Sequence, residues 1–294
     1  MQIYPPDHKR GYWWRVIVWR VRRDGFPRLF VMMLRRLSRP AWFAGIILWG
    51  AGCIMVALPT PTPAATVMPQ SSADWQQIAP GIEQRSYSPA WLARLTVLRI
   101  DPAQVTIQSH YSPQAPRTVM QWRNAYPDAA ILINTNFFDS ADEITGMLIA
   151  DGVRYGESYR NRGGTFYMQN GVPGMFSHLV RQYQGEAYDQ AVQAFPMLIT
   201  DGARSYFDQR PDRATRRTVI GLDSQGRVVI LVTTFGGITL LDLAIYLAES
   251  DLQLVNALNL DGGGSSLLSV RAGTQDIAFT SFDPVPSVLA VYPR

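Results

Sequence analysis

The chain is 294 residues long, with 47% hydrophobic and 17% charged residues, which fits a globular protein with some membrane character. Its formal net charge of +4 is uneven, because Lys9 and nine arginines lie within residues 1–40 and the remainder is mildly acidic. The basic balance therefore gives no reason to expect nucleic acid as a partner. The single cysteine, Cys53, excludes an intrachain disulfide and a cysteine-based zinc site.

The first 58 residues carry two membrane signals. Residues 1–40 interleave arginines with aromatic and aliphatic side chains, which is typical of a segment at an anionic membrane surface; a solvated cytoplasmic tail is the alternative. Residues 41–58 are an uncharged run of 18, close to the roughly 20 needed to span a bilayer. Since the arginines precede this run, the positive-inside rule predicts a cytoplasmic N-terminus and an extracytoplasmic remainder. We predict a retained transmembrane signal anchor; a cleaved signal peptide and a buried core helix are the alternatives.

After the apolar run, residues 59–74 are rich in Pro, Ser and Thr and are interpreted as an extended linker, so the folded domain is predicted to cover residues 75–294. Apolar runs bounded by turn residues predict strands at 94–100, 104–110, 130–133, 146–149, 165–169, 195–200, 218–223, 228–234, 253–260, 267–270 and 288–291. The first two read as a β-hairpin around Asp101-Pro102.

Two helices are predicted among these strands, at 118–126 and 240–249. Thr239 caps the second helix, with Asp242 in the capping-box position. Because short strands dominate and crossover helices are few, a doubly wound parallel sheet is disfavoured. The sequence predicts a single strand-rich α+β domain with a mixed or antiparallel sheet, preceded by one transmembrane helix.

The most informative stretch lies at 258–268, where an apolar run ends in a carboxylate, three glycines and two serines. Consecutive glycines have a high backbone entropy cost, so they indicate positive φ or close backbone approach. Their amides can form an anion-binding nest, with Asp261 at its lip. A Gly-rich turn between two strands is the alternative. The stretch matches neither a phosphate-binding Walker loop nor a nucleophile elbow.

Four stretches follow one another within residues 90–292: Ile-Asn-Thr-Asn-Phe-Phe-Asp at 133–139, Phe-Pro-Met-Leu-Ile-Thr-Asp-Gly at 195–202, Arg-Arg-Thr-Val-Ile-Gly-Leu-Asp at 216–223, and Ala-Leu-Asn-Leu-Asp-Gly-Gly-Gly-Ser-Ser at 257–266. Together they resemble the phosphodiester glycosidase family. One departure is Asn136, at a place where the family usually has a small residue. The resemblance implies hydrolysis of a sugar-1-phosphodiester, of the N-acetylglucosamine type, to free sugar and a phosphomonoester.

That reaction assigns roles to particular residues. The site must hold a diester anion, stabilise an oxocarbenium-like centre and activate water or supply a nucleophile. We expect Asp261 to be the base or nucleophile, Arg217 to grip phosphate through its planar fork, and Asn134 to bind sugar hydroxyls or orient Asp261. A turn aspartate, a surface arginine and a strand-end asparagine are the alternatives. Further substrate contacts are expected from Asn136, Asp139, Thr218, Asn259, Gly262, Gly263, Gly264 and Ser265.

The sequence offers several candidates for a second catalytic carboxylate and for metal ligands. Glu157 and Asp139 are both candidates for the second carboxylate, and the sequence does not rank them. Asp139, Asp142, Asn259 and Asp261 carry hard oxygen ligands that suit Ca²⁺, but no spaced calcium loop is present. We predict no required cofactor, with Ca²⁺ as the alternative.

Two other functions remain open at this stage. A serine hydrolase would use Ser265 or Ser266 with His110 or His178 as base. A non-catalytic cell-surface module would bind glycosyl phosphodiesters without turnover.

Overall fold

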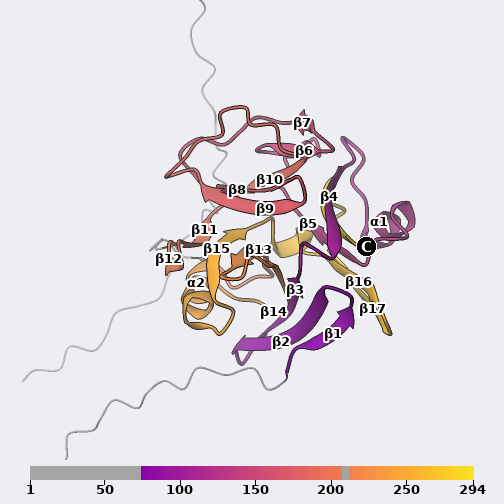
Figure 1. The fold of residues 1–294 in the computed structure, drawn as a ribbon, viewed down its shortest axis with the longest axis vertical. Helices are drawn as coiled ribbons and strands as arrows, with labels where there is room; N and C mark the ends of the chain where they lie inside the picture. Colours follow the sequence, from indigo (N-terminus) through magenta and orange to yellow (C-terminus); the bar gives the residue numbers. More distant parts are fainter. Residues whose placement is uncertain (1–73, 207–211) are drawn as a thin grey trace, which may run out of the picture. The chain divides into compact units, whose positions relative to one another are not determined.

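Every strand pairing in the described part of the chain, residues 74–206 and 212–294 of this computed structural model, is antiparallel. The largest sheet has eight strands (Figure 1). Its order is β1 (Gln76–Ala79), β2 (Ile82–Ala90), β3 (Ala93–Ile100), β14 (Val228–Gly236), β13 (Thr218–Asp223), β15 (Leu254–Asn259), β11 (Met197–Thr200) and β12 (Ala203–Arg204).

Two five-stranded sheets complete the strand framework. One has the order β7 (Val153–Tyr155), β6 (Leu148–Ala150), β10 (Gln190–Ala194), β8 (Gly164–Gln169) and β9 (Val172–Ser177). The other has the order β17 (Gln275–Phe279), β16 (Leu268–Ala272), β5 (Ile131–Asn134), β18 (Ser287–Pro293) and β4 (Val105–Tyr111).

The two α-helices of the described residues cover different sheets. α2 (Leu240–Glu249) packs Leu243 and Leu247 against large-sheet residues such as Leu231. α1 (Val119–Ala125) packs Trp122 against the sheet that contains β5 and β18. Both helices begin at a threonine cap, because the hydroxyl accepts an otherwise unpaired first-turn N–H: Thr118 from Gln121 and Thr239 from Asp242.

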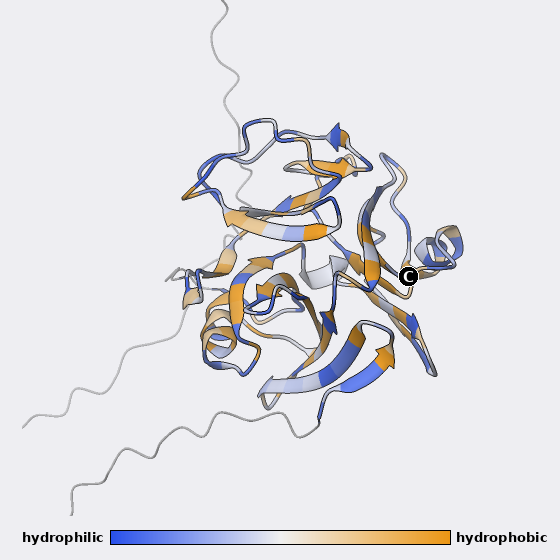
Figure 2. Ribbon diagram, in the orientation of Figure 1, coloured by the Kyte–Doolittle hydropathy of each residue, from blue (hydrophilic) through white to orange (hydrophobic). Residues whose placement is uncertain are grey.

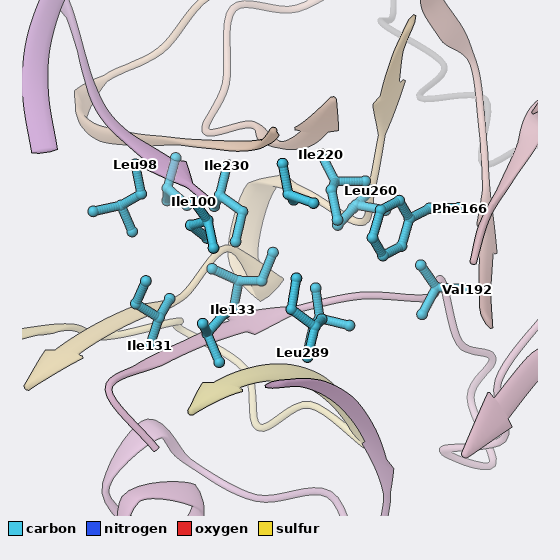
Figure 3. Packing of buried hydrophobic residues seen from close by; sticks show 14 of the residues in the cluster. Leu98, Ile100, Ile131, Ile133, Phe166, Val192, Ile220, Ile230, Leu260 and Leu289 are labelled. Atoms are coloured by element: carbon cyan, nitrogen blue, oxygen red, sulfur yellow. The ribbon is translucent and has the colours of Figure 1, made fainter. Parts of the chain in front are cut away.

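The main core lies where the three sheets meet (Figure 3). Leu98 and Ile230 of the large sheet face Ile133 and Leu289, and Phe166 of β8 closes the side. Towards the edge of the large sheet, β2 is mostly hydrophilic (Figure 2), in keeping with its partly exposed side chains. The inner strand β13 and the first six residues of β14 are almost wholly buried, which matches their nearly continuous apolar sequence.

The strand-rich α+β architecture with few helices and a mixed or antiparallel sheet was predicted from sequence and is confirmed, with antiparallel pairing throughout the described residues. The capped helix at 240–249 and the strand at 218–223 are confirmed as well. The predicted hairpin around Asp101-Pro102 is wrong. β3 pairs with β2 and β14, whereas β4 pairs with β18, so the chain changes sheets at this turn. Alternation identified both strands, but their partners are distant in sequence and invisible to a local pattern.

The predicted basic segment at 1–40, apolar run at 41–58 and linker through residue 73 lie outside the described residues. Among the residues that are described, no helix is long and apolar enough to span a bilayer.

Candidate active site around Asp261

Asn134 joins two sheets at the centre of the candidate site. Asn134 is the last residue of β5, and its Nδ2 donates a 2.6 Å hydrogen bond to the backbone carbonyl of Asp261. Asp261 lies two residues after the end of β15, next to Leu260. Its Oδ1 accepts from the Thr218 hydroxyl at 2.8 Å and from the Leu267 amide at 3.1 Å. Asn134 is 1% exposed, and these three bonds use most of its capacity. The geometry therefore favours the orienting role for Asn134 over direct contact with sugar hydroxyls.

The Asp261 carboxyl group is half-buried, and its environment alters its acidity. Burial raises the pKa of Asp261 to about 6; hydrogen bonds from the Ser265 side chain and the Gly262 amide lower it, and the charge of Asp283 raises it. Oδ1 accepts the Gly262 N–H at 2.8 Å. A carboxyl with this pKa exchanges protons near neutral pH, as a catalytic acid or base must. Asp283, which sequence reasoning missed, is the second carboxylate whose charge acts on Asp261.

The three glycines form a tight turn instead of an open nest. Gly263 has φ +61°, a left-handed conformation that favours glycine. Its amide donates to the Arg216 carbonyl at 2.8 Å, and the Ser265 amide donates to the Gly262 carbonyl at 3.1 Å. A side chain at Gly262 would stand 2.8 Å from the Arg216 carbonyl. The Gly262, Gly263 and Ser265 amides already donate to protein acceptors. The turn is therefore suited to holding Asp261 close to the Arg216 backbone rather than to binding an anion.

A second segment, residues 158–163, supplies groups that sequence reasoning missed. The Tyr159 hydroxyl lies 2.8 Å from the Thr145 hydroxyl, and its ring packs edge-on against Phe195. The Arg162 guanidinium lies 3.7 Å from the Phe195 ring centroid and 4.7 Å from that of Tyr159. Burial raises the pKa of Tyr159; the hydrogen bond with Thr145 and the charge and hydrogen bond of Arg162 lower it, and the Asp261 charge raises it. Tyr159 is therefore electrostatically linked to both Arg162 and Asp261.

A buried polar network holds that segment in place. Gln193 Oε1 accepts the Tyr159 amide at 2.9 Å, and Gln193 Nε2 donates to Thr165 at 3.1 Å. His178 bonds Thr165 through Nε2 at 2.7 Å and the Arg162 carbonyl through Nδ1 at 2.9 Å. Because a carbonyl only accepts, Nδ1 carries the proton, and burial lowers the pKa of His178, which favours this neutral form. Asn136 extends the network by donating to the Gln193 carbonyl at 3.1 Å.

Arg217 differs from its expected role as a phosphate clamp. Its side chain is 9% exposed, with Nε donating to the Ile238 carbonyl and Nη2 donating to Asp212 and to the Arg213 carbonyl. These bonds tie the start of β13 to the segment before α2. The geometry thus favours a structural role for Arg217, because its planar fork is already occupied.

The remaining expected residues are spread around the centre. Glu157 is exposed and lies 4.0 Å from Arg154. Asp139 accepts the amides of Ala141 and Glu143, as a turn aspartate does. Asn259 donates to the Phe195 carbonyl at 3.0 Å and leaves its buried Oδ1 without a partner. Thr218 bonds Asn134 and Ser266. Within the described ranges, no three acidic, histidine or cysteine side chains are grouped so as to hold a metal.

The serine hydrolase alternative finds no support here. His178 is buried in the network above, and His110 stacks on Tyr126 and bonds the Tyr292 hydroxyl at 2.8 Å. Neither of these described histidines is hydrogen-bonded to Ser265 or Ser266.

The fold and the polar cluster around Asp261 define a strand-rich α+β domain with a half-buried carboxyl group of raised pKa at its candidate site. A family model for phosphodiester glycosidases matches residues 127–292, more than half of the chain, and all of the candidate site residues lie within that range. The chain belongs to the phosphodiester glycosidase family, as the four sequence stretches predicted. Family membership makes it a hydrolase, which sets aside the non-catalytic binding module.

Three solved structures share the fold. The zebrafish N-acetylglucosamine-1-phosphodiester α-N-acetylglucosaminidase catalytic domain, auto-inhibited by its pro-peptide, is 18% identical with a TM-score of 0.56, covering 76% of this chain and 87% of that one. A hypothetical protein from Synechocystis is 15% identical (TM-score 0.52; 73% and 62% covered). A putative exported protein from Burkholderia pseudomallei is 12% identical (TM-score 0.51; 68% and 74% covered). No curated protein sequence matches the chain significantly.

Proposed function

We propose that this protein hydrolyses glycosyl-1-phosphodiesters of the N-acetylglucosamine type, with Asp261 at the reacting centre. The observation that carries the proposal is the half-buried Asp261 carboxyl group, with its pKa raised to about 6, in a chain of the phosphodiester glycosidase family. The bond that breaks joins the anomeric carbon to the phosphate oxygen. Water adds to that carbon, and the products are the free sugar and a phosphomonoester.

The phosphomonoester leaving group determines which catalytic groups the site requires. A phosphomonoester departs far more readily than a sugar alkoxide, so strong protonation of the leaving oxygen matters less than in ordinary glycosidases. The main requirements are a base or nucleophile at the anomeric carbon, stabilisation of the cationic centre and a contact for the diester charge. Ionised Asp261 meets the first two requirements. As a base it takes the proton of the attacking water, which it later passes to solvent.

Arg162 is our proposed contact for the diester phosphate, in place of Arg217. It is exposed, its guanidinium is held against Phe195, and no carboxylate of the described residues forms an ion pair with it. An arginine guanidinium that is not paired with a carboxylate is the group that grips a phosphate bidentately. Asn134 acts as a positioning residue, since it holds the Asp261 backbone.

We further propose an extracytoplasmic, membrane-anchored location for the enzyme. The support is the uncharged run at 41–58 with arginines only on its N-terminal side. An extracytoplasmic domain would meet glycosyl phosphodiesters outside the cell.

A substrate panel tests the activity. The purified protein is incubated with sugar-1-phosphodiesters that differ in sugar and alcohol, and the released reducing sugar is measured alongside the phosphomonoester. Equal amounts of both products are expected from N-acetylglucosamine-1-phosphodiesters. The Asp261→Asn variant serves as the matched blank. Release of an alcohol with sugar-1-phosphate retained would mean cleavage on the other side of phosphorus and would overturn the proposal.

A further inference from the structure

An apolar groove lies beside the candidate site. It has a volume of about 510 Å³, and its floor and walls include Phe195, Pro196 and Met197. Leu179 and Val180 stand at its rim and are 76% and 79% exposed. Neither belongs to a core cluster of the described residues. Large apolar side chains this exposed, grouped along a hollow, are typical of a surface that binds an apolar ligand.

The groove is continuous with the candidate site through Arg162 and Phe195. Both residues line it, and the Arg162 guanidinium rests on the Phe195 ring. The position of Arg162 is set by its neighbours: His178 bonds its carbonyl, and a side chain on Gly163, which has φ +67°, would overlap the Ala194 carbonyl. A cation held by the backbone at the end of an apolar groove matches a ligand with an anionic head and an apolar tail.

The other side of the same segment has the opposite character. A hollow of about 620 Å³ is lined by polar and charged side chains, among them Arg154, Tyr159 and Gln182. Asn161 lines both this hollow and the apolar groove. The Tyr159 ring packs edge-on against Phe195, and its hydroxyl lies 2.8 Å from the Thr145 hydroxyl. Residues 158–163 therefore separate a polar side, which Tyr159 lines and which suits a sugar, from an apolar side.

We propose that the groove binds an apolar aglycone, so that the substrates are glycosyl phosphodiesters of a lipid alcohol. This inference rests on the proposed function. The sugar lies towards Tyr159 and Asp261, the diester charge lies at Arg162, and the hydrocarbon chain lies along Phe195 and Met197 beneath Leu179 and Val180. A fully buried methylene improves binding by about fourfold, and a groove open on one side captures part of that for each carbon it covers.

Two N-acetylglucosamine-1-phosphodiesters, one with a methyl and one with an octyl alcohol, test the proposal. The full chain is used in lipid nanodiscs, because free detergent would compete for the groove. We expect kcat/KM to be at least about tenfold higher for the octyl diester. The double variant Leu179→Ser/Val180→Ser should lose most of that preference while the methyl diester is cleaved as by wild type. Val172→Ser, at another exposed valine, which lies outside the groove, should leave the preference unchanged.

Calorimetric binding of octyl phosphate and methyl phosphate adds a measurement that needs no turnover. Tighter binding of octyl phosphate, lost in the double variant, supports the groove. Cleavage of both diesters with equal kcat/KM would overturn the groove inference and leave the proposed function standing. Absence of cleavage of either diester would overturn the proposed function. A change of oligomeric state in the double variant with no loss of octyl preference would assign the groove to a second copy of the chain and overturn the proposal.

Discussion

The Asn134 side-chain amide donates a 2.6 Å hydrogen bond to the main-chain carbonyl of Asp261, across 127 residues of sequence. The bond links β5 of one sheet to the end of β15 in another, so the position of the candidate catalytic carboxylate depends on how two sheets meet. Because Asn134 bonds the backbone of Asp261 and not its carboxylate, it sets the place of that group without contributing to its pKa.

Replacing Asn134 by Ala should damage stability and turnover together. The change leaves the Asp261 carbonyl and the Leu267 amide without this partner and leaves the Thr218 hydroxyl with Ser266 alone, which costs about 2–4 kcal/mol of unfolding free energy. Urea denaturation measures this loss. Thr218→Ser keeps the hydroxyl and is the matched control. An Asn134→Ala protein of wild-type stability would remove the sheet-to-sheet role.

Asp261→Asn should lower turnover by about 10²-fold or more, the low end for general acid–base catalysis. In the wild type, kcat/KM should rise with pH and level off above about 6, because the carboxyl group must be ionised to act as base or nucleophile. Steady-state kinetics from pH 4.5 to 8 give both results. A pH profile that is flat across this range would separate Asp261 from the reaction.

The same substitution makes a prediction about stability, with a definite sign. The folded-state pKa of Asp261, about 6, lies above the 3.8 of an unperturbed aspartate. The favourable contribution of Asp261 to the free energy of unfolding is therefore fully present below about pH 4 and is lost as pH rises through about 6. Above pH 6 the wild type bears the cost of a buried charge, on the order of 1–3 kcal/mol, that asparagine avoids. Thermal unfolding should show Asp261→Asn more stable than wild type at pH 8, with the difference gone at pH 4.

Arg162→Lys and Arg217→Lys should have opposite consequences. Lysine at 162 keeps the charge but loses the planar fork and the stacking on Phe195, so kcat/KM should fall about tenfold with little change in stability. Lysine at 217 loses guanidinium bonds to Asp212 and to two carbonyls, so stability should fall by about 1–3 kcal/mol. Steady-state kinetics and urea denaturation of both variants show which arginine contacts the phosphate and which one stabilises the fold. The reverse pattern would return the phosphate contact to Arg217.

Topology can be tested with a reporter fused after Arg294. The one-sided arginines before residues 41–58 predict activity from a reporter that works only outside the cytoplasm, and membrane partition of the full chain. Reporter activity on the cytoplasmic side would contradict the predicted orientation.

The local sequence determined most of the secondary-structure elements and pointed to one candidate functional residue. The capping residues Thr239 and Asp242 predicted α2, and apolar runs with turn residues predicted β13 and β14, because these signals act within a few residues. The four sequence stretches identified the family, and the carboxylate beside three glycines singled out Asp261. At that turn only glycine readily adopts the left-handed conformation at Gly263.

Tertiary structure alone decided which groups surround Asp261 and which face each strand presents to them. Strand alternation cannot reveal that β3 and β4 join different sheets, nor that Arg217 turns its guanidinium towards Asp212. Arg162 looked like one of many loop arginines until the fold placed it on Phe195. The physical reason is distance along the chain: these contacts depend on packing between segments far apart in sequence, whereas propensity, capping and turn chemistry act only between near neighbours.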